Sequence, residues 1–151
     1  MATIKRFEEL EVWQIARELC QFIRQLTSKE DFSRNFALKN QIEKSSGSSM
    51  DNIAEGFGRG GRQEFIQFLW ISHGSTDEVK SQLYRALDHQ NITEDEFNQG
   101  YELAHKLNNK LISFINYLNN TRYKGIKYQK SNQPNTKQQN TPNPQPPPKS
   151  P

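Results

Sequence analysis

The glycines between residues 56 and 61 have the spacing of a nucleotide-binding loop. Gly56, Gly58 and Gly61 form Gly-x-Gly-x-x-Gly, the fingerprint in which backbone N–H groups bind a dinucleotide pyrophosphate. That chemistry requires glycines that follow a β-strand and open a helix. Here a helical pattern precedes them, and no βαβ unit surrounds them. We therefore interpret Gly56 as a small packing position and Gly58 to Gly61 as a turn. Gly61 is then a weak N-cap of the next helix, with Glu64 at its capping position.

Asn52 and Glu55 lie one helical turn apart, just before these glycines. They could form a polar site inside a helical bundle. They could also be structural, with Glu55 paired to an arginine such as Arg17 and Asn52 bonded to backbone. A buried carboxylate needs a partner in either case. A lone glutamate without a nucleophile, a second acid or a metal ligand is not catalytic machinery. We favour the structural interpretation and expect no enzyme activity.

The cysteine and histidine content argues against a metal centre. Cys20 is the only cysteine in the chain, which excludes an intrachain disulfide and a cysteine-based metal site. His73, His89 and His105 are sixteen residues apart and lack the spacing of zinc ligands. We expect neither a metal nor a cofactor, and no small-molecule substrate is indicated.

Positive charge is concentrated at the C-terminal end of the chain. Residues 1–121 contain 14 Lys and Arg against 17 Asp and Glu, a net charge of −3, whereas residues 122–151 contain six Lys and Arg and no acid. Two tyrosines, Tyr123 and Tyr128, accompany four of these cations: Arg122, Lys124, Lys127 and Lys130. Cations attract phosphate, and aromatic rings stack on unpaired bases. The segment is a candidate RNA contact, although a solubilising role fits the composition equally well.

A second group of cations lies near the glycine turn. Arg59 and Arg62 flank the turn, and Arg34, Lys39 and Lys44 precede or begin the helical pattern that leads to it. The simpler interpretation makes them solvated loop charges. The sharper interpretation makes them a phosphate-binding patch for RNA, and the sequence leaves both open.

Apolar residues recur at helical spacing in four segments, and none of them alternates as a β-strand does. The segments run from about residue 8 to 27, 38 to 58, 62 to 89 and 93 to 118. The second segment passes through the poor helix formers at 45–49, and its apolar stripe continues on both sides. We interpret that run as a close helix contact rather than a linker or a hinge. Four helices with short connections predict an all-α fold, an antiparallel up-down four-helix bundle.

The last helical segment has a clearly marked start, and the residues that follow it have a different composition. Thr93 and Glu96 have the spacing of a capping box, and acidic residues fill the following turn. Residues 122–151 are rich in Asn, Gln, Pro and Lys and contain a single aliphatic residue. Such a composition cannot bury enough apolar surface to offset its chain entropy. We predict a bundle domain over residues 1–121 and a disordered tail over residues 122–151.

The third segment carries residues that lie away from its main apolar stripe. Wound as a helix, it places Ile66, Trp70 and His73 on its outer side. Because aromatic side chains anchor protein interfaces, we predict a subunit contact there. The alternatives are a docking site for a different protein and an isolated surface ring.

No feature of the sequence indicates a membrane or export. No apolar run reaches membrane-spanning length, and the N-terminal stretch MATIKRFEEL lacks the hydrophobic region of a secretory signal. We expect a cytoplasmic protein that does not enter a membrane.

Three stretches are more specific than periodicity alone. They are FEELEVWQIARELC at 7–20, NIAEGFGR at 52–59 and EFIQFLWISHGSTDEVKSQL at 64–83. In this order and spacing they resemble the bundle proteins encoded in intervening sequences of 23S rRNA genes, also called the S23 ribosomal protein-like family. The resemblance spans about residues 4–118. Positions within these stretches that we treat as the structural motif are Trp13, Asn52, Glu55 and Gly56.

This resemblance implies an up-down four-helix bundle that assembles as a homopentamer. More distant relatives include accessory proteins of diversity-generating retroelements, which bind a reverse transcriptase and nucleic acid. Together with the charge distribution, the resemblance predicts a non-enzymatic, RNA-associated accessory scaffold. The alternative is a protein–protein interaction module that binds no nucleic acid.

Overall fold

The computed structural model describes residues 3–121 of the 151-residue chain. Its elements are the 3-10 turn η1 (Phe7–Glu9) and the helices α1 (Glu11–Thr27), α2 (Glu30–Ser33), α3 (Phe36–Gly58), α4 (Arg62–Asp88) and α5 (Glu94–Asn120). Residues 3–121 contain no β-strand. The all-α prediction is confirmed. The disorder predicted for residues 122–151 lies outside the described residues.

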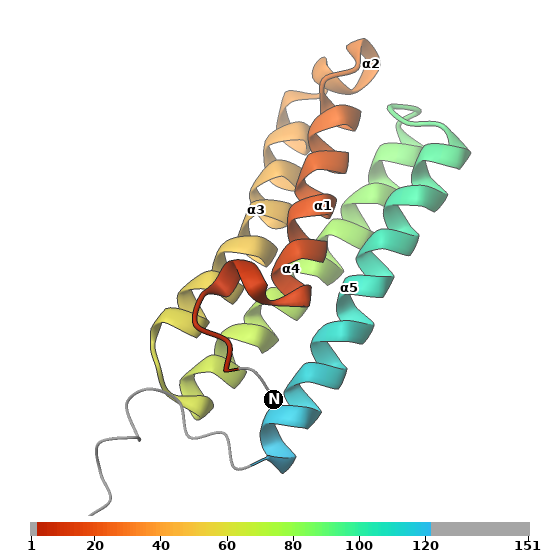
Figure 1. The fold of residues 1–151 in the computed structure, drawn as a ribbon. Coiled ribbons are helices and arrows are strands. Elements are labelled where there is room, and N and C mark those ends of the chain that lie inside the picture. The colour runs from red at the N-terminus through yellow and green to blue at the C-terminus, as the bar shows by residue number, and fades with distance from the viewer. Residues whose placement is uncertain (1–2, 122–151) are drawn as a thin grey trace, which may run out of the picture.

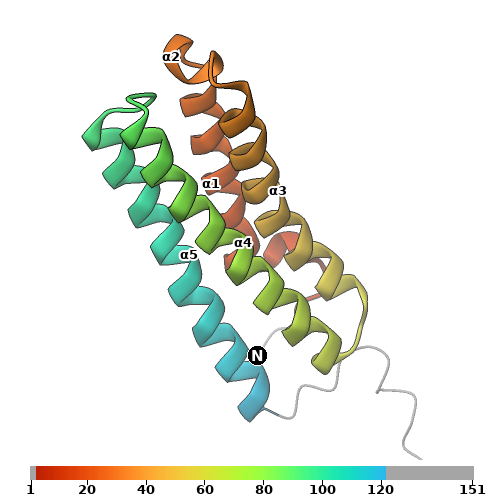
Figure 2. The same ribbon diagram turned by 180° about the vertical axis from the view of Figure 1, so that it is seen from behind.

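Four long helices pack side by side in the cyclic order α1, α3, α4, α5 (Figures 1 and 2). At one end, Arg62 Nη1 at the start of α4 donates to the carbonyl oxygen of Thr121, just after α5, at 2.9 Å. At the other end, Lys29 after α1 forms an ion pair with Glu96 at the start of α5. Neighbouring helices are therefore antiparallel, and the predicted up-down four-helix bundle is confirmed.

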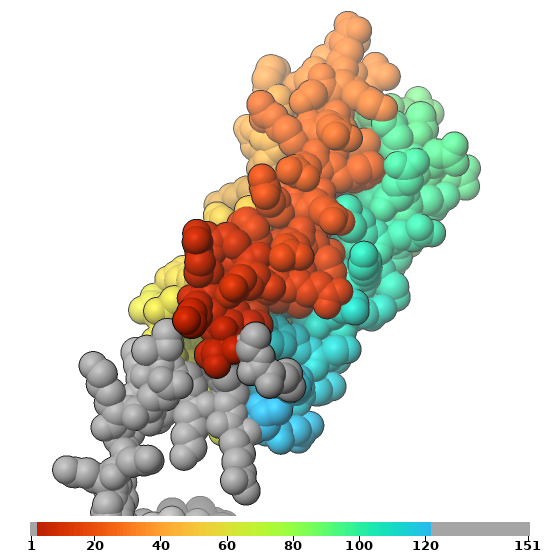
Figure 3. Space-filling model, in the orientation of Figure 1, coloured from red at the N-terminus to blue at the C-terminus, as the bar shows by residue number. Residues whose placement is uncertain are grey.

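Apolar side chains from all four long helices and from α2 fill the centre of the bundle. The largest fully buried ones are Leu19, Ile23, Phe32, Leu38, Ile42, Ile53, Leu69, Leu83, Leu107, Leu111, Ile115 and Leu118. Within each long helix they recur every three or four residues, or at multiples of a turn. Burying each such side chain contributes about 1.5–3 kcal/mol. The core is therefore the main source of bundle stability. On the outside of the molecule, Figure 3 shows α1, in red, lying against α5 in blue-green.

The first half of the chain departs from the predicted element bounds. Residues 8 and 9 belong to η1, and α1 begins only at Glu11. The loop after α1 contains the short helix α2, whose Phe32 is fully buried. Helix α3 begins at Phe36, because Asn35 Oδ1 accepts the backbone N–H of Leu38 at 3.4 Å and caps it. One-turn elements such as η1 and α2 are too short to show a period in the sequence.

The predicted start of α5 is confirmed atom by atom. Thr93 Oγ1 accepts the backbone N–H of Glu96 at 3.1 Å, and Glu96 Oε1 accepts the backbone N–H of Thr93 at 2.9 Å. The turn predicted for Gly58 to Gly61 is present but one residue shorter, because Gly58 still belongs to α3 and the turn covers Arg59 to Gly61. Gly60 has φ 78° and so needs the freedom of glycine, while Gly61 is the extended N-cap of α4.

The serine- and glycine-rich run of α3 is helical and packs closely on α4. Ser49 Oγ lies 2.9 Å from Thr76 Oγ1, and Ser72 Oγ donates to the Ser49 carbonyl oxygen at 2.6 Å. The hydroxyls of Ser48 and Ser75 are also 2.9 Å apart. Small side chains let the two backbones approach, and the hydroxyls satisfy one another inside the bundle. The predicted close helix contact is confirmed.

Gly56 is the tightest point of this contact. A Cβ atom at Gly56 would lie 2.4 Å from Phe68 Cβ and 3.1 Å from Phe65 Cδ2. The glycine therefore serves helix packing, as predicted. Because Gly56 and Gly58 belong to the last turn of a helix, they do not form the strand-to-helix loop of a dinucleotide site.

We predict that Gly56→Ala lowers the free energy of unfolding by about 1–3 kcal/mol, since the new methyl group overlaps a neighbouring Cβ that cannot move without its backbone. Urea unfolding followed by circular dichroism measures the change. Gly58→Ala is the matched control, because no atom lies within 4 Å of a Cβ at Gly58. The control should be neutral or stabilise by up to ~1 kcal/mol. Equal losses of stability in the two variants would contradict the packing role of Gly56.

Candidate functional site

The outer seam between α4 and α5 carries a row of aromatic and basic side chains. We call this row the α4–α5 aromatic face: Trp70, His73, Lys80 and Tyr84 from α4, with Tyr101 and His105 from α5. The Tyr84 and Tyr101 ring centroids are 5.8 Å apart, and the Tyr101 and His105 rings stack at 6.3 Å. Lys80 Nζ lies 5.3 Å from the Tyr101 ring centre and 3.3 Å from His105 Nδ1. Both helices thus contribute to one surface.

Trp70 is the largest exposed side chain of this face. It is 49% exposed, and the next residue, Ile71, is 50% exposed. The Trp70 ring meets His73 edge to face with centroids 5.5 Å apart. Large apolar side chains are usually buried further, so this pair leaves apolar area in water that a partner could cover. The predicted outward position of Trp70 is confirmed.

The outward position predicted for Ile66 is wrong. Ile66 is 7% exposed and belongs to the buried core. Helix α4 packs against α3 on one side and α5 on the other, so it buries a wider arc than its main apolar stripe. His73 is intermediate in exposure, since 21% of its side chain is exposed. Its Nδ1 atom lies 3.5 Å from Asp77 Oδ2. Of the three predicted interface residues, Trp70 alone is an exposed one.

Asn52 and Glu55 have structural contacts. Asn52 Nδ2 donates to the carbonyl oxygen and to the hydroxyl of Ser48, at 2.8 and 2.9 Å. Glu55 pairs with Arg59 at 2.8 Å, and its side chain is 53% exposed. The partner suggested from the sequence, Arg17, lies instead over the Trp13 ring, 5.9 Å from its centre. Glu55 points to solvent, so it forms no polar site inside the bundle, and its partner is the arginine one turn away on its own helix.

Trp13 ties the N-terminal segment to the bundle. Its ring meets Phe7 of η1 edge to face with centroids 5.1 Å apart. Both rings are half-buried and pack against the core. Trp13 is therefore a packing residue at the point where η1 turns into α1.

Both arginines beside the glycine turn are engaged within the chain. Arg59 pairs with Glu55, and its guanidinium lies 5.4 Å from the centre of the Phe68 ring. Arg62 binds the carbonyl oxygen of Thr121. Further up the bundle, Arg34 forms an ion pair with Glu30. These contacts fit structural charges better than a phosphate-binding patch. The remaining candidates for RNA contact, Arg122, Lys124, Lys127 and Lys130, lie outside the described residues.

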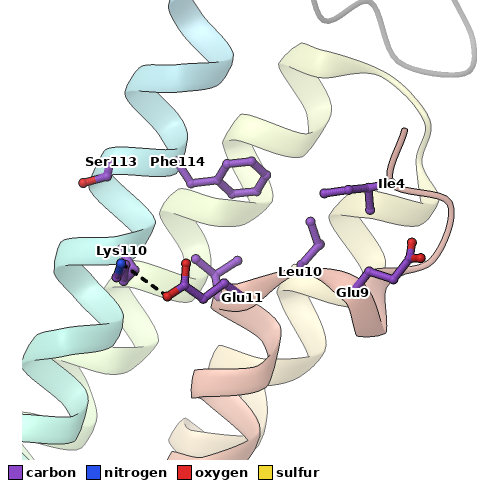
Figure 4. Close-up of a pocket in the computed structure, with 8 residues that line it drawn as sticks. Ile4, Glu9, Leu10, Glu11, Lys110, Ser113 and Phe114 are labelled. Atoms are coloured by element: carbon purple, nitrogen blue, oxygen red, sulfur yellow. Dashed lines mark ion pairs between the residues drawn. The ribbon is translucent and has the colours of Figure 1, made fainter. Parts of the chain in front are cut away.

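A cavity of about 410 Å³ lies between the N-terminal segment and α5 (Figure 4). It forms at the end of the bundle where α1 begins, because α1 starts only at Glu11 whereas the neighbouring α5 continues to Asn120. Its lining residues are Ile4, Glu9, Leu10, Glu11, Val12, Lys110, Ser113 and Phe114. No periodic pattern in the sequence marks this cavity, because the segment before α1 folds back without forming a long helix.

The charged groups of this cavity are already bonded. Lys110 Nζ lies 3.2 Å from Glu11 Oε1. The Glu9 carboxylate accepts the backbone N–H groups of Lys5 and Arg6 at 2.8 and 3.0 Å. These hydrogen bonds hold the pKa of Glu9 below its usual value, and the bond from the Lys5 backbone has the largest effect. The cavity therefore offers mainly apolar walls.

Cys20 sits between α1 and α3 and is not activated. Its thiol donates to the carbonyl oxygen of Ser46 at 3.1 Å. Burial raises the pKa of the Cys20 thiol to about 11, and the hydrogen bond to Ser46 opposes this only in part. A thiol with a raised pKa is a poor nucleophile at neutral pH.

The described part of the chain holds neither a metal cluster nor a membrane-spanning helix. Within residues 3–121, no three His, Cys, Asp or Glu side chains are placed to hold a metal ion. No helix in that range combines the length and apolar character needed to cross a membrane.

The sequence matches the family model of the 23S rRNA-intervening sequence protein over residues 8–113. The chain belongs to this family. Its fold is similar to a solved member of the S23 ribosomal protein family, a protein of unknown function from Bacteroides thetaiotaomicron VPI-5482. The two chains are 24% identical with a TM-score of 0.64, over 69% of this chain and 97% of the other. This likeness shows the shared fold. No curated protein matches the chain.

We predict that Cys20 of this 23S rRNA-intervening sequence protein reacts slowly with iodoacetamide in the folded state. With a pKa of about 11 in place of 9.0, its thiolate fraction near neutral pH is about a hundredfold below that of an unperturbed thiol. The alkylation rate, followed by mass spectrometry, should keep rising up to about pH 11. The urea-unfolded chain is the control and should level off near pH 9.0. Matching profiles for the two states would contradict the burial of the thiol.

Proposed function

We propose that this protein is a non-enzymatic oligomeric scaffold, a homopentamer, that associates with RNA. The bundle builds the assembly through the α4–α5 aromatic face, and the basic C-terminal residues contact the RNA. The observation that carries the proposal is the half-exposed Trp70 beside the half-exposed Ile71.

The composition of this face supports a protein contact. Interfaces are enriched in aromatic residues at their centre and surrounded by polar groups that remain hydrated at the rim. Trp70 and Ile71 supply the apolar centre. His73, Asp77 and Lys80 lie beside them on α4 and supply polar groups of both signs. Covering the two large side chains would remove apolar area from water, which favours association.

The charge distribution supports a separate site for RNA. In the bundle, Arg59 and Arg62 are held by internal contacts, and residues 1–121 have a net charge of −3. Residues 122–151 have a net charge of +6. Phosphate attraction scales with the number of cations that can reach the backbone. An assembly of several chains would present several such segments to one RNA. The family name, which refers to 23S rRNA-intervening sequences, supports RNA as the partner.

The same aromatic face supports a second candidate function, a module that binds a different protein and no nucleic acid. Trp70 would then anchor that protein rather than another copy of the chain. The oligomeric state separates the two candidates, because the second requires no self-association through Trp70.

We predict that the full-length protein elutes as a pentamer and that Trp70→Glu reduces it to a monomer, because a charge at the centre of an apolar contact cannot be desolvated cheaply. Size-exclusion chromatography with light scattering measures the mass. Phe36→Glu is the matched control, because Phe36 is 72% exposed at the start of α3, far from Trp70 along the bundle. A wild-type monomer, or an unchanged pentamer in Trp70→Glu, would contradict the proposed assembly.

We predict that replacing Arg122, Lys124, Lys127 and Lys130 with Gln weakens binding to a fluorescent single-stranded RNA and flattens its salt dependence. The slope of log affinity against log salt should fall by about 0.7 for each phosphate group that the variant no longer neutralises. Fluorescence anisotropy across about 50–200 mM salt measures it.

The control replaces Lys5, Arg24, Lys106 and Lys110, all within the described residues and outside both groups of candidate RNA contacts, with Gln and makes the same change in net charge. We expect this variant to keep most of the wild-type slope. Equal effects in the two variants would mean that binding depends on overall charge alone. An unchanged slope in the C-terminal variant would remove residues 122–130 from the mechanism.

A further inference from the structure

The cavity between the N-terminal segment and α5 has apolar walls that face each other across open space. Figure 4 shows Ile4 and Phe114 pointing towards each other from its two sides. Ile4 is 44% exposed, although it lines the same cavity as the buried Leu10. The cavity measures about 410 Å³, whereas an apolar cavity of about 150 Å³ already binds benzene. It therefore has room for more than one large side chain.

Exposed apolar surface continues from this cavity to the end of α5. The Phe114 ring stacks on the Tyr117 ring, with centroids 6.3 Å apart. Tyr117 is 45% exposed, and α5 ends within the next turn, at Asn120. A strip of apolar side chains therefore joins the cavity to the place where the chain leaves the bundle.

The residues that follow α5 begin at this place. Arg62 Nη1 holds the Thr121 carbonyl oxygen at 2.9 Å, and residues 122–151, outside the described residues, start from there. Residues 131–151 contain no Ala, Val, Leu, Ile or Met and no aromatic residue. A segment that serves only solubility gains nothing from apolar side chains grouped beside the bundle. The apolar side chains of this segment are nevertheless grouped at its start: Tyr123, Ile126 and Tyr128.

The chain is long enough to bring Ile126 into the cavity. At about 1.5 Å per residue, Phe114 lies roughly 10 Å back along α5 from Thr121. Thr121 has extended backbone angles, φ −104° and ψ 164°, so the chain leaves the helix at this residue. The five residues from Thr121 to Ile126 span up to about 16 Å when extended, which leaves about 6 Å for the chain to reverse its direction.

Charge favours the same arrangement, although salt screens its contribution. The Glu9 carboxylate lines the cavity and is held by backbone N–H groups, which carry no formal charge. Lys110, which also lines the cavity, already pairs with another glutamate. Lys124 and Lys127 stand on either side of Ile126. Docking of that residue would bring ammonium groups near the Glu9 carboxylate, and opposite charges attract.

We propose that residues 123–128 dock on the bundle of their own chain. Ile126 fills the cavity between Ile4 and Phe114, and Tyr123 lies along the end of α5. The contact holds the basic residues that follow α5 at one end of the bundle. It requires neither self-assembly nor RNA, because every group in it belongs to one copy of the chain.

The first experiment traps this contact with a disulfide in the full-length protein. In a Cys20→Ser background, Ser113→Cys places a thiol at the cavity wall, and Lys127→Cys places a second thiol next to Ile126. The control pair combines Ser113→Cys with Lys137→Cys, beyond the apolar group. With oxidised glutathione, we expect the first pair to form an intrachain disulfide at least tenfold faster than the control. Chain length alone gives about a twofold difference, because ring closure falls as roughly the −3/2 power of length.

Adding Ile126→Asn to the first cysteine pair tests the apolar side chain itself. The rate should fall to about that of the control, since both thiols remain in place and only the apolar contact is lost. Non-reducing gels separate links within one chain from links between copies. Equal rates for the two pairs, or a rate that Ile126→Asn leaves unchanged, would overturn the inference. Links that form only between copies would also overturn it, because the cavity would then hold a segment of another copy.

The second experiment measures the contact without cysteines, from the Tm of full-length variants followed by circular dichroism. Ile4→Ser and Ile126→Ser should each lower Tm by about 2–5 °C. The double variant should lose little more than Ile4→Ser alone, because both changes remove the same contact. Gln133→Ser is the control and should leave Tm unchanged. An unchanged Tm in Ile126→Ser, or additive losses in the double variant, would show that Ile126 does not occupy the cavity.

Discussion

The close approach of α3 and α4 is the constraint on which the rest of the bundle depends. Gly56 brings the two backbones together against Phe68, and the hydroxyls of Ser49, Ser72 and Thr76 bond across the contact. A buried hydroxyl without a partner costs about 1–3 kcal/mol. Sliding one helix along the other would break these pairs and press Phe68 against a residue larger than glycine. The polar pairs and the glycine together fix both the register and the rotation of the two helices.

This fixed rotation determines what the bundle shows to solvent. On α4 it turns Ser72 towards α3 and Ile66 towards the core, which leaves a narrow outer strip occupied by Trp70 and Ile71. On α3 the same rotation turns Gly47 outward into open space. The surface proposed for assembly is therefore a consequence of interior packing. A sequence change inside the α3–α4 contact would reach the outer surfaces by rotating a helix, without altering any exposed residue.

The long helices can be predicted from sequence because each repeats its apolar pattern over many turns. The serine run is recognisable as helical for the same reason, and Thr93 and Glu96 mark a helix start through bonds local to one turn. Features set by packing between helices are less accessible. The prediction for Ile66 fails because burial on α4 depends on two neighbouring helices. The predicted partner of Glu55 is wrong because several arginines are compatible with the sequence, and only geometry selects Arg59.

Internal pairing also limits what the bundle surface can offer to a polyanion. Arg34 and Arg59 each pair with an exposed carboxylate, whose negative charge opposes a phosphate nearby, and Arg62 binds the carbonyl oxygen of Thr121. The cations beyond residue 121 have no acid among them to pair with. Their attraction to a single RNA is weak for one copy and screened by salt, but it multiplies when several copies share one assembly. RNA affinity in this scheme therefore depends on the packing of Trp70, because assembly is what brings the basic segments together.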